Sequence, residues 1–377
     1  MKRTVSILVL VMVLAISVPS MAADMSKYNI VTSADTHKVI FDTDMGYFGD
    51  DTYAMFILLQ ADAAGYIDLL GVTSTGGNVT IGQGTTAILN QLEALGRDDI
   101  PVYIGTDVPI MGLWFDDITV RANGLTQIRS MKNVIDYGQT TTWDNLGPLK
   151  NEAWGYSSLS PQEGHAWEFM IEQVHKYPGQ VTIMAVGAAT NVAIACLSDP
   201  TFAENTAGIY WMGGAIDVPG NDTSSAERNW YYDPHAVKIS LQQPFPKQVI
   251  IPHDISHYQR LTKEIMDGFA ENNNTVYTEL IVEHAYPRFE NDPGRSQRLW
   301  DAQVPGVFLV PDLIASSDER YVGMVTEMGY SFGESVFWMD SGEMDDAPSE
   351  AGYATIVYDV HGDQYWEFVV DLLSTEF

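Results

Sequence analysis

The fold follows from one stretch near the start of the chain, VIFDTDMGYFGDD, which spans residues 39–51. Its apolar beginning, Val39 to Phe41, is typical of a short buried strand, and the glycines of residues 45–49 indicate a turn. Asp50 and Asp51 then open an apolar helix, where acidic residues are favoured. The stretch therefore predicts a strand, a tight turn and a helix, with acidic side chains gathered at the turn.

Four carboxylates are crowded at this turn: Asp42, Asp44, Asp50 and Asp51. They repel one another unless a cation lies among them, and Ca²⁺ or Mg²⁺ is a natural choice because both prefer oxygen ligands. Alternatively, Asp50 or Asp51 caps the helix and the other acids are solvated loop residues. The stretch alone leaves both interpretations open.

The rest of the chain alternates short apolar runs with amphipathic ones. Strands are predicted at residues 39–41, 69–73, 102–104, 181–185, 209–212 and 249–251, and helices at 50–63, 80–95, 165–177, 190–197 and 234–241. This alternation predicts a single α/β domain with a mostly parallel central sheet flanked by helices. Residues 324–339 and 354–360 predict a C-terminal β-hairpin, and residues 364–373 a final helix.

Polar or glycine-rich residues follow several predicted strands. They include Gly76-Gly77-Asn78, Gly187, Gly213-Gly214 and the polar cluster of residues 221–229. Ligands of parallel sheets bind at the carboxyl ends of the strands, so these residues predict a binding site there. The amides of the 221–229 cluster suit a ligand with several hydroxyls, although a solvated loop has the same composition. The irregular segment 112–160 is predicted to be a long loop that covers the site.

The N-terminus predicts export. Lys2 and Arg3 precede an apolar run that closes on Ser20-Met21-Ala22, which is the pattern of a secretory signal peptide over residues 1–22. We therefore expect a periplasmic or secreted bacterial protein. The full chain has a net charge of −31, which falls by two when Lys2 and Arg3 are removed. So acidic a protein is not expected to bind nucleic acid or anionic membranes.

These motifs together resemble the inosine-uridine preferring nucleoside hydrolase family. The resemblance rests on Asp42 to Gly46 with Asp50-Asp51, then Gly77-Asn78, Ala188 to Asn191, Trp211 to Gly214, Asn221, Glu227, Asn229, Asp233-Pro234 and Trp300-Asp301. It runs from about residue 37 to residue 377, in the same order and spacing. It implies a single catalytic domain over residues 37–377, Ca²⁺ as cofactor, a nucleoside substrate and a homo-oligomer, either a dimer or a tetramer.

The resemblance also implies a role for each matching residue. The Ca²⁺ ligands would be the carboxylates of Asp44, Asp51 and Asp301 with the backbone carbonyl of Val186. The ribose would be held by Asp50, Asn78, Met212, Asn221, Glu227 and Asn229. Asp44 would also be the catalytic proton acceptor from water, and Asp42 would order the loop in support. No organic cofactor is implied.

Trp300 departs from the pattern of many family members, which carry a histidine immediately before the last metal ligand. In this respect the chain resembles the purine-preferring, inosine-adenosine-guanosine type, in which aromatic rings sandwich the base. A stacked tryptophan favours a large flat base. Trp114 and Trp143 are candidates for the partner ring, and ordinary loop anchors are the alternative. His253 and His257 are interpreted as loop or supporting residues rather than catalytic ones.

Three other functions remain open on the sequence. A strand that ends in Asp-x-Asp is also found in haloacid dehalogenase-type phosphotransferases, but Gly46 stands where that class expects Thr or Val. An exported nucleoside- or sugar-binding protein could use the same groups without turnover. Hydrolysis of another ribosyl or glycosyl compound on the same fold also fits, because residues that hold the ribose say little about the leaving group.

Overall fold

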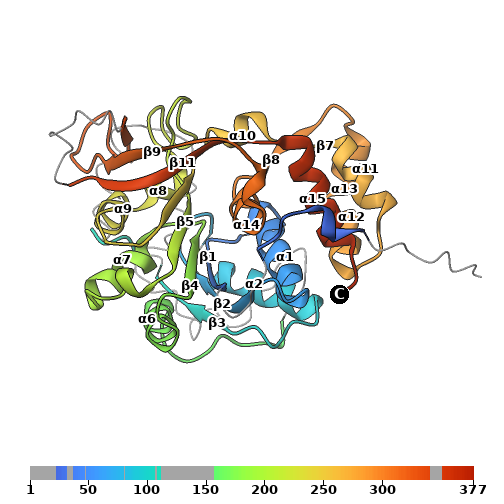
Figure 1. Ribbon diagram of the computed structural model, residues 1–377, viewed down its shortest axis with the longest axis horizontal. Helices are drawn as coiled ribbons and strands as arrows, with labels where there is room; N and C mark the ends of the chain where they lie inside the picture. Colours follow the sequence, from blue (N-terminus) through green and yellow to red (C-terminus); the bar gives the residue numbers. More distant parts are fainter. Residues whose placement is uncertain are drawn as a thin grey trace, which may run out of the picture.

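The structure is a computed structural model that describes residues 23–31, 37–46, 48–79, 81–106, 108–111, 157–339 and 350–377. Among these residues the central sheet has nine strands in the order β10-β9-β11-β6-β5-β4-β1-β2-β3 (Figure 1). The predicted parallel strands are β1 (Lys38–Thr43), β2 (Asp68–Ser74), β3 (Val102–Ile104), β4 (Val181–Ala185), β5 (Gly208–Met212) and β6 (Gln248–Ile251). Neighbours among these six strands are parallel. The predicted α/β fold with a mostly parallel sheet is therefore confirmed.

Helices cover both faces of this sheet. The predicted helices are α1 (Asp50–Ala63), α2 (Ile81–Ala94), α6 (Ala166–Lys176), α7 (Thr190–Ser198) and α9 (Pro234–Leu241). Within β1, Val39 and Phe41 belong to the core shared with α1, whereas Ile40 belongs to the core shared with α6 and α7. Successive side chains of a strand point to opposite faces, so a strand buried on both faces is apolar at every position. This explains why the strands read as continuous apolar runs.

The C-terminal strands correct part of the prediction. Residues 324–339 do not form one strand, because β9 (Ile314–Met324) ends where the predicted strand begins and β10 is Ser335–Met339. Between them the chain turns at Gly333, which has a φ of +79° and whose N–H bonds back to the Val325 carbonyl. Positive φ values of this kind favour glycine. β11 (Gly352–Val360) pairs with β9 and also with β6, so β9 lies between β10 and β11 and the three strands extend the central sheet. The two strands of the predicted hairpin therefore do not pair with each other.

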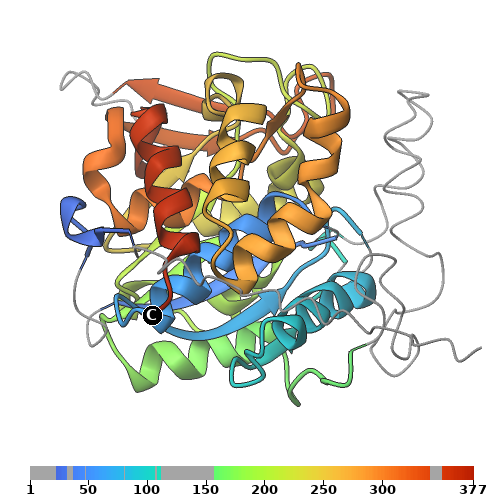
Figure 2. The ribbon, with the colours of Figure 1, turned by 90° about the vertical axis from the view of Figure 1, so that its right-hand side faces the viewer.

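A helical layer that the sequence did not predict lies between β6 and β9. It contains α10 (Ile255–Tyr258), α11 (Lys263–Glu271), α12 (Val276–His284) and α13 (Tyr286–Asn291), and β7 (Arg260–Thr262) pairs with β8 (Ser296–Arg298) beside it. Figure 2 shows this layer beside the red α15 (Gly362–Ser374), which packs against α11 and α12. α14 (Gln303–Leu309) follows β8 and packs in the same core as α1.

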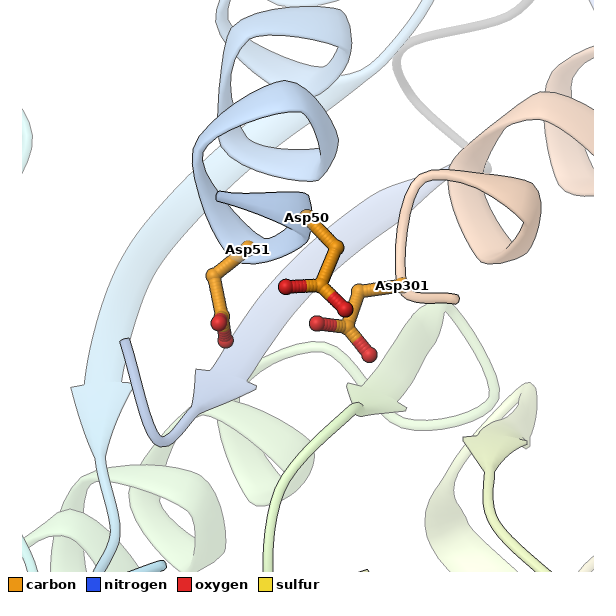
Figure 3. Close-up of side chains that lie close together, drawn as sticks. All are labelled: Asp50, Asp51 and Asp301. Carbon is orange, nitrogen blue, oxygen red and sulfur yellow. The ribbon is translucent and has the colours of Figure 1, made fainter. Parts of the chain in front are cut away.

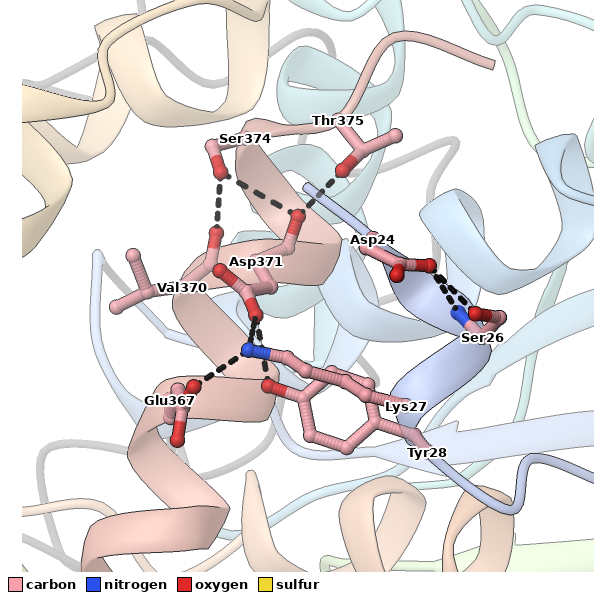
Figure 4. Close-up of polar contacts among 9 residues, drawn as sticks. All are labelled: Asp24, Ser26, Lys27, Tyr28, Glu367, Val370, Asp371, Ser374 and Thr375. Carbon is pink, nitrogen blue, oxygen red and sulfur yellow. Dashed lines mark hydrogen bonds and ion pairs between the residues drawn. The ribbon is translucent and has the colours of Figure 1, made fainter. Parts of the chain in front are cut away.

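The described N-terminal segment is fastened to the last helix (Figure 4). Lys27 forms ion pairs with Glu367 and, at 2.8 Å, with Asp371, and the Tyr28 hydroxyl donates to Asp371 at 2.7 Å. The Tyr28 ring also meets Phe368 edge to face. No helix in the described part of the chain is long and apolar enough to cross a membrane. The predicted signal peptide, residues 1–22, lies outside the described residues.

The strand order reverses on either side of β1. The chain proceeds outward from β1 to β2 and β3 on one side, and from β4 to β5 and β6 on the other. In open parallel sheets such a reversal leaves a crevice at the carboxyl ends of the two central strands. Asp42 and Asp44 stand at that end of β1, and Val186 follows β4. The topology therefore places the acidic turn where ligands bind in this architecture.

Candidate active site

Asp42 is a buried acid that joins two strands and a helix. Its Oδ1 accepts hydrogen bonds from the Thr73 hydroxyl at 2.6 Å and the Asn191 amide at 2.8 Å. Asn191 also donates to the Ser74 carbonyl. Burial raises the pKa of Asp42 to about 7, although both hydrogen bonds act in the opposite direction. These contacts join β1, β2 and the start of α7 at the site.

Asp44 lies at the centre of the turn, 2% exposed. Its Oδ2 accepts the Asn78 backbone N–H at 2.7 Å, whereas its Oδ1 is buried without a hydrogen-bond partner among the described residues. Gly77 permits this approach, because a Cβ there would stand 2.0 Å from Oδ2. Burial raises the pKa of Asp44 to about 7, with Asp50 and Glu227 adding to the rise and Arg228 opposing it.

Three further carboxylates lie close together (Figure 3), near enough to Asp44 to interact with it electrostatically. Asp50 and Asp51 come from the first turn of α1, and Asp301 precedes α14; one oxygen from each lies within 4.8 Å of the others. Thr43 donates its hydroxyl to Asp51. Burial and the neighbouring carboxylates raise the pKa of Asp51 and of Asp301 well above the ordinary value. Asp50, and not Asp44, therefore forms the compact group with Asp51 and Asp301.

The donor set fits a hard cation. All candidate side-chain ligands are carboxylates, which suit Ca²⁺, and ligands that stand 2.3–2.6 Å from the ion are at most about 5 Å apart. One carboxylate oxygen each from Asp50, Asp51 and Asp301 lies within 4.8 Å of the others, which satisfies this limit. The unpartnered Oδ1 of Asp44 adds a buried acceptor that lacks a hydrogen-bond donor. Buried charges in proteins are paired or coordinate metals, so the arrangement calls for a positive ion.

The ribose-binding residues predicted from the polar cluster are organised by α8 (Arg228–Tyr232). Glu227 caps this helix, accepting the backbone N–H groups of Asn229, Trp230 and Gly214. Asn229 donates its amide to the Val186 carbonyl at 2.7 Å and to the Met212 sulfur at 3.1 Å. A carbonyl has two lone pairs, so the Val186 oxygen keeps one for another ligand.

A cavity of about 310 Å³ opens above the carboxylates. Its lining contains the predicted residues Asp50, Asn78, Met212, Asn221, Glu227, Asn229, Trp300 and Asp301, together with Arg228 and Arg298. Asp44 and Asp51 do not line it and lie deeper. Asp301, the third predicted metal ligand, lines the cavity together with the predicted ribose ligands Asp50 and Glu227, so the lining alone does not separate metal from substrate ligands. The sequence analysis did not predict that the two arginines line the cavity. The only signal for them was their closeness in sequence to Glu227 and Trp300.

The aromatic side of the cavity is fixed by a histidine. The Trp300 indole N–H donates to His253 Nδ1 at 2.6 Å, and the two rings are nearly parallel with centroids 5.8 Å apart. His253 is 1% exposed, and burial lowers its pKa to about 4, so its ring is neutral and can accept this hydrogen bond. His253 thus supports Trp300, as the sequence interpretation proposed. Tyr47, Trp114, Trp143 and the predicted loop 112–160, apart from its last residues, lie outside the described residues.

A mostly parallel α/β sheet with a carboxylate-lined cavity at its switch point suits an enzyme that binds its substrate beside an oxygen-ligated cation. The comparisons with known proteins agree with this class. The model of the inosine-uridine preferring nucleoside hydrolase family matches residues 39–367, and the chain belongs to that family. The protein is therefore a nucleoside hydrolase. This excludes the two alternatives of a haloacid dehalogenase-type phosphotransferase and of an exported binding protein without turnover.

Relatives within this family differ in the bases that their names give. The chain is 32% identical to the pyrimidine-specific ribonucleoside hydrolase RihA of Citrobacter koseri, over 79% of this chain and 87% of that protein. A plant nucleoside hydrolase, PpNRh1, has a TM-score of 0.72 at 24% identity, covering 90% of this chain and 100% of its own. A purine-preferring ribonucleoside hydrolase from Gardnerella vaginalis has a TM-score of 0.69 at 22% identity, covering 89% and 98%. At these identities the two structures support the fold alone.

Proposed function

We propose that the protein hydrolyses the N-glycosidic bond of purine ribonucleosides with the help of Ca²⁺, releasing ribose and the free base. The observation that carries this proposal is the 310 Å³ cavity, which combines hydroxyl-binding groups, buried carboxylates and an aromatic ring. The expected cation ligands are Asp44, Asp51 and Asp301 with the Val186 carbonyl. Bound there, Ca²⁺ would polarise a water and lower its pKa.

The chain's own residues supply the remaining chemistry. Cleavage of a ribosyl C–N bond builds positive charge on the sugar, as in other glycoside hydrolyses, and the carboxylates beside the cavity favour that charge. Asp44 is the proton acceptor because its Oδ1 has no hydrogen-bond partner among the described residues.

The ribose is positioned by groups that are themselves held in place. Asp50 and Asn78 lie on one side of the cavity lining, and Asn221, Glu227 and Asn229 come from the segment around α8. Asn229 is anchored to Val186 and Glu227 to three backbone N–H groups. Held groups lose little freedom when they bind, so they can orient the sugar for attack at C1′.

Purine preference is supported by Trp300. Its indole ring lies at the cavity and its N–H is engaged by His253, so the ring is presented in one orientation. A fixed tryptophan stacks more area on a purine than on a pyrimidine. Because a relative is named pyrimidine-specific, purine and pyrimidine nucleosides must be compared directly.

Export is supported by the N-terminal sequence, and the first described residues already bind α15 through Lys27 and Tyr28. Residues after a cleavage near position 22 would therefore belong to the folded protein. We expect the mature protein in the periplasm or medium, and a dimer or tetramer in solution. Cell fractionation and light scattering test these two expectations.

The central experiment incubates the mature protein with inosine, guanosine, adenosine, uridine and cytidine in Ca²⁺, with and without a chelator, and follows free base. We expect faster release from the purine nucleosides and loss of activity on chelation. Equal or faster release from uridine refutes the purine preference. No release from any nucleoside refutes this choice of substrate.

A further inference from the structure

Two guanidinium groups line a cavity whose proposed substrate is neutral. Arg228 and Arg298 both contribute to the lining, Arg298 two residues before Trp300. The chain has only 19 basic residues against 50 acidic ones, so basic residues are scarce in it. Neither the ribose nor the base of an ordinary nucleoside carries a negative charge. The two arginines at this cavity therefore call for a separate explanation.

Arg298 lacks the partner that a charged side chain usually has. Within the described part of the chain it forms no ion pair, and its Nε is shielded from solvent yet donates no hydrogen bond. Its guanidinium carbon lies 6.0 Å from the centroid of the Trp300 ring. A shielded donor without an acceptor costs free energy, which a bound anion would recover.

A second arginine faces Arg298 from the neighbouring strand. Arg260 of β7 is paired with Arg298 of β8 in the antiparallel ladder. Arg260 donates from Nε to the His257 carbonyl at 3.5 Å and forms no ion pair within the described residues. Like charges directly across a ladder destabilise it, so this pairing is costly unless an anion lies nearby.

Arg228 differs from these two because acids already surround it. It lies 3.8 Å from the Asp222 carboxylate, and its charge opposes the rise in the pKa of Asp44. Arg228 therefore offsets part of the negative charge of the site. Arg298 and Arg260, by contrast, form no ion pair within the described residues.

We infer that the cavity takes nucleoside 5′-monophosphates, with Arg298 binding the phosphate and Arg260 adding positive potential behind it. This inference rests on the proposed function, because it adds a recognition element to the same hydrolysis. A phosphate monoester carries about −1.5 to −2 charge near pH 7 and three strong acceptor oxygens. Guanidinium groups bind such oxygens in pairs, which satisfies Nε together with a terminal nitrogen.

The reaction is the hydrolysis already proposed, with the phosphate unchanged. Water adds to C1′, the C1′–N bond breaks, and its electron pair leaves with the base. The base takes up one proton, and ribose 5-phosphate is released. No oxidant, reductant or further reactant is needed.

The first test measures binding, which does not depend on turnover. Calorimetry compares ribose 5-phosphate with ribose on the intact protein, on Arg298→Gln and on the control Arg295→Gln, which changes an exposed arginine three residues away. We expect ribose 5-phosphate to bind about 10- to 100-fold more tightly than ribose, the range for hydrogen bonds to a charged group. Arg298→Gln should remove most of that difference and Arg295→Gln none. Equal affinity for the two sugars in the unchanged protein overturns the inference.

The second test measures turnover of inosine 5′-monophosphate, inosine and orotidine, following free base and the sugar product. We expect the largest kcat/KM for the monophosphate, and a ratio to inosine that falls about tenfold or more in Arg298→Gln. Cleavage of inosine alone, or an equal loss on both substrates in Arg298→Gln, overturns the inference and leaves the proposed function standing. A preference for orotidine, whose carboxylate is on the base, overturns the assignment to phosphate. If neither inosine compound is cleaved, the proposed function fails and the calorimetry still decides the inference.

Discussion

The floor of the site, below the cavity, and its rim consist of different kinds of side chain. The floor consists of carboxylates from three places, Asp44 after β1, Asp51 in α1 and Asp301 before α14, and all are buried. The rim consists of Trp300 and Arg298, whose guanidinium lies over the Trp300 ring, and His253 lies behind Trp300 and accepts its N–H. The floor holds negative charge that a cation must balance, whereas the rim presents aromatic and positive groups. We infer that the floor determines the reaction and the rim determines the substrate.

The largest expected effect comes from the floor. Asp44→Asn removes the proposed proton acceptor and one cation ligand while keeping the shape of the side chain. We expect kcat to fall by about 10³-fold or more, since a general base alone contributes about 10²–10⁴. Steady-state release of base from inosine measures this loss.

The matched control is Asp292→Asn, which changes an exposed aspartate outside the cavity. Its kcat should equal that of the unchanged protein. A loss below about tenfold in Asp44→Asn would remove Asp44 from its catalytic role.

Removal of the cation should destabilise the fold in a pH-dependent way. Without it, burial raises the pKa of Asp44 to about 7 and those of Asp51 and Asp301 well above their ordinary values. An acid whose pKa is raised by folding contributes stability below its unfolded pKa and loses it as pH rises through its folded pKa. In chelator, the melting temperature should therefore fall as pH increases from 5 to 8.

Thermal melts with Ca²⁺ and with chelator measure this difference at each pH. The stabilisation by Ca²⁺ should be larger at pH 8 than at pH 5, because the ion binds the ionised acids and not the unfolded chain. A Ca²⁺ effect that is absent at pH 8 would contradict a cation at the floor.

A change at the rim should alter selectivity rather than abolish the reaction. In Trp300→His the large ring is lost while a smaller aromatic side chain remains. We expect the ratio of kcat/KM for inosine over uridine to fall by about 2- to 10-fold, the range of aromatic pair energies. An unchanged ratio would remove Trp300 from base selection.

The smallest effect is expected one step behind the rim. His253→Phe deletes the acceptor of the Trp300 N–H and keeps a ring of similar shape. Loss of one hydrogen bond of ordinary strength predicts a rise in KM for inosine of about 2- to 10-fold with little change in kcat. His253→Gln, which keeps an acceptor, should recover part of the loss. An equal fall in kcat for both variants would instead indicate a general structural defect.

The sequence predicted the parallel sheet and the floor well because both depend on local signals. Buried parallel strands are continuous apolar runs, and the predicted strands 102–104 and 181–185 coincide with β3 and β4. Carboxylates directly after such strands must meet at one edge of the sheet. Asp301 lies far from the other acids in the sequence, so no local pattern predicted its place in the floor. That prediction came from the family resemblance.

The rim and the outer strands were harder to predict because long-range packing determines them. β9 includes the polar residues Ser316 to Arg320, so its first part did not resemble a strand. The contact between Trp300 and His253 joins residues 47 positions apart and leaves no periodic signal. Arg298 was visible beside Trp300, but its lack of an acidic partner becomes apparent only in three dimensions.

We propose that the buried carboxylates hold a catalytic Ca²⁺. The most direct test titrates Ca²⁺ into chelator-treated protein by calorimetry and measures release of base from inosine and its 5′-monophosphate at each point. We predict one Ca²⁺ per chain, activity that rises in proportion to its occupancy, and loss of both in Asp51→Asn. Full activity on either substrate in protein without bound Ca²⁺ would contradict the account.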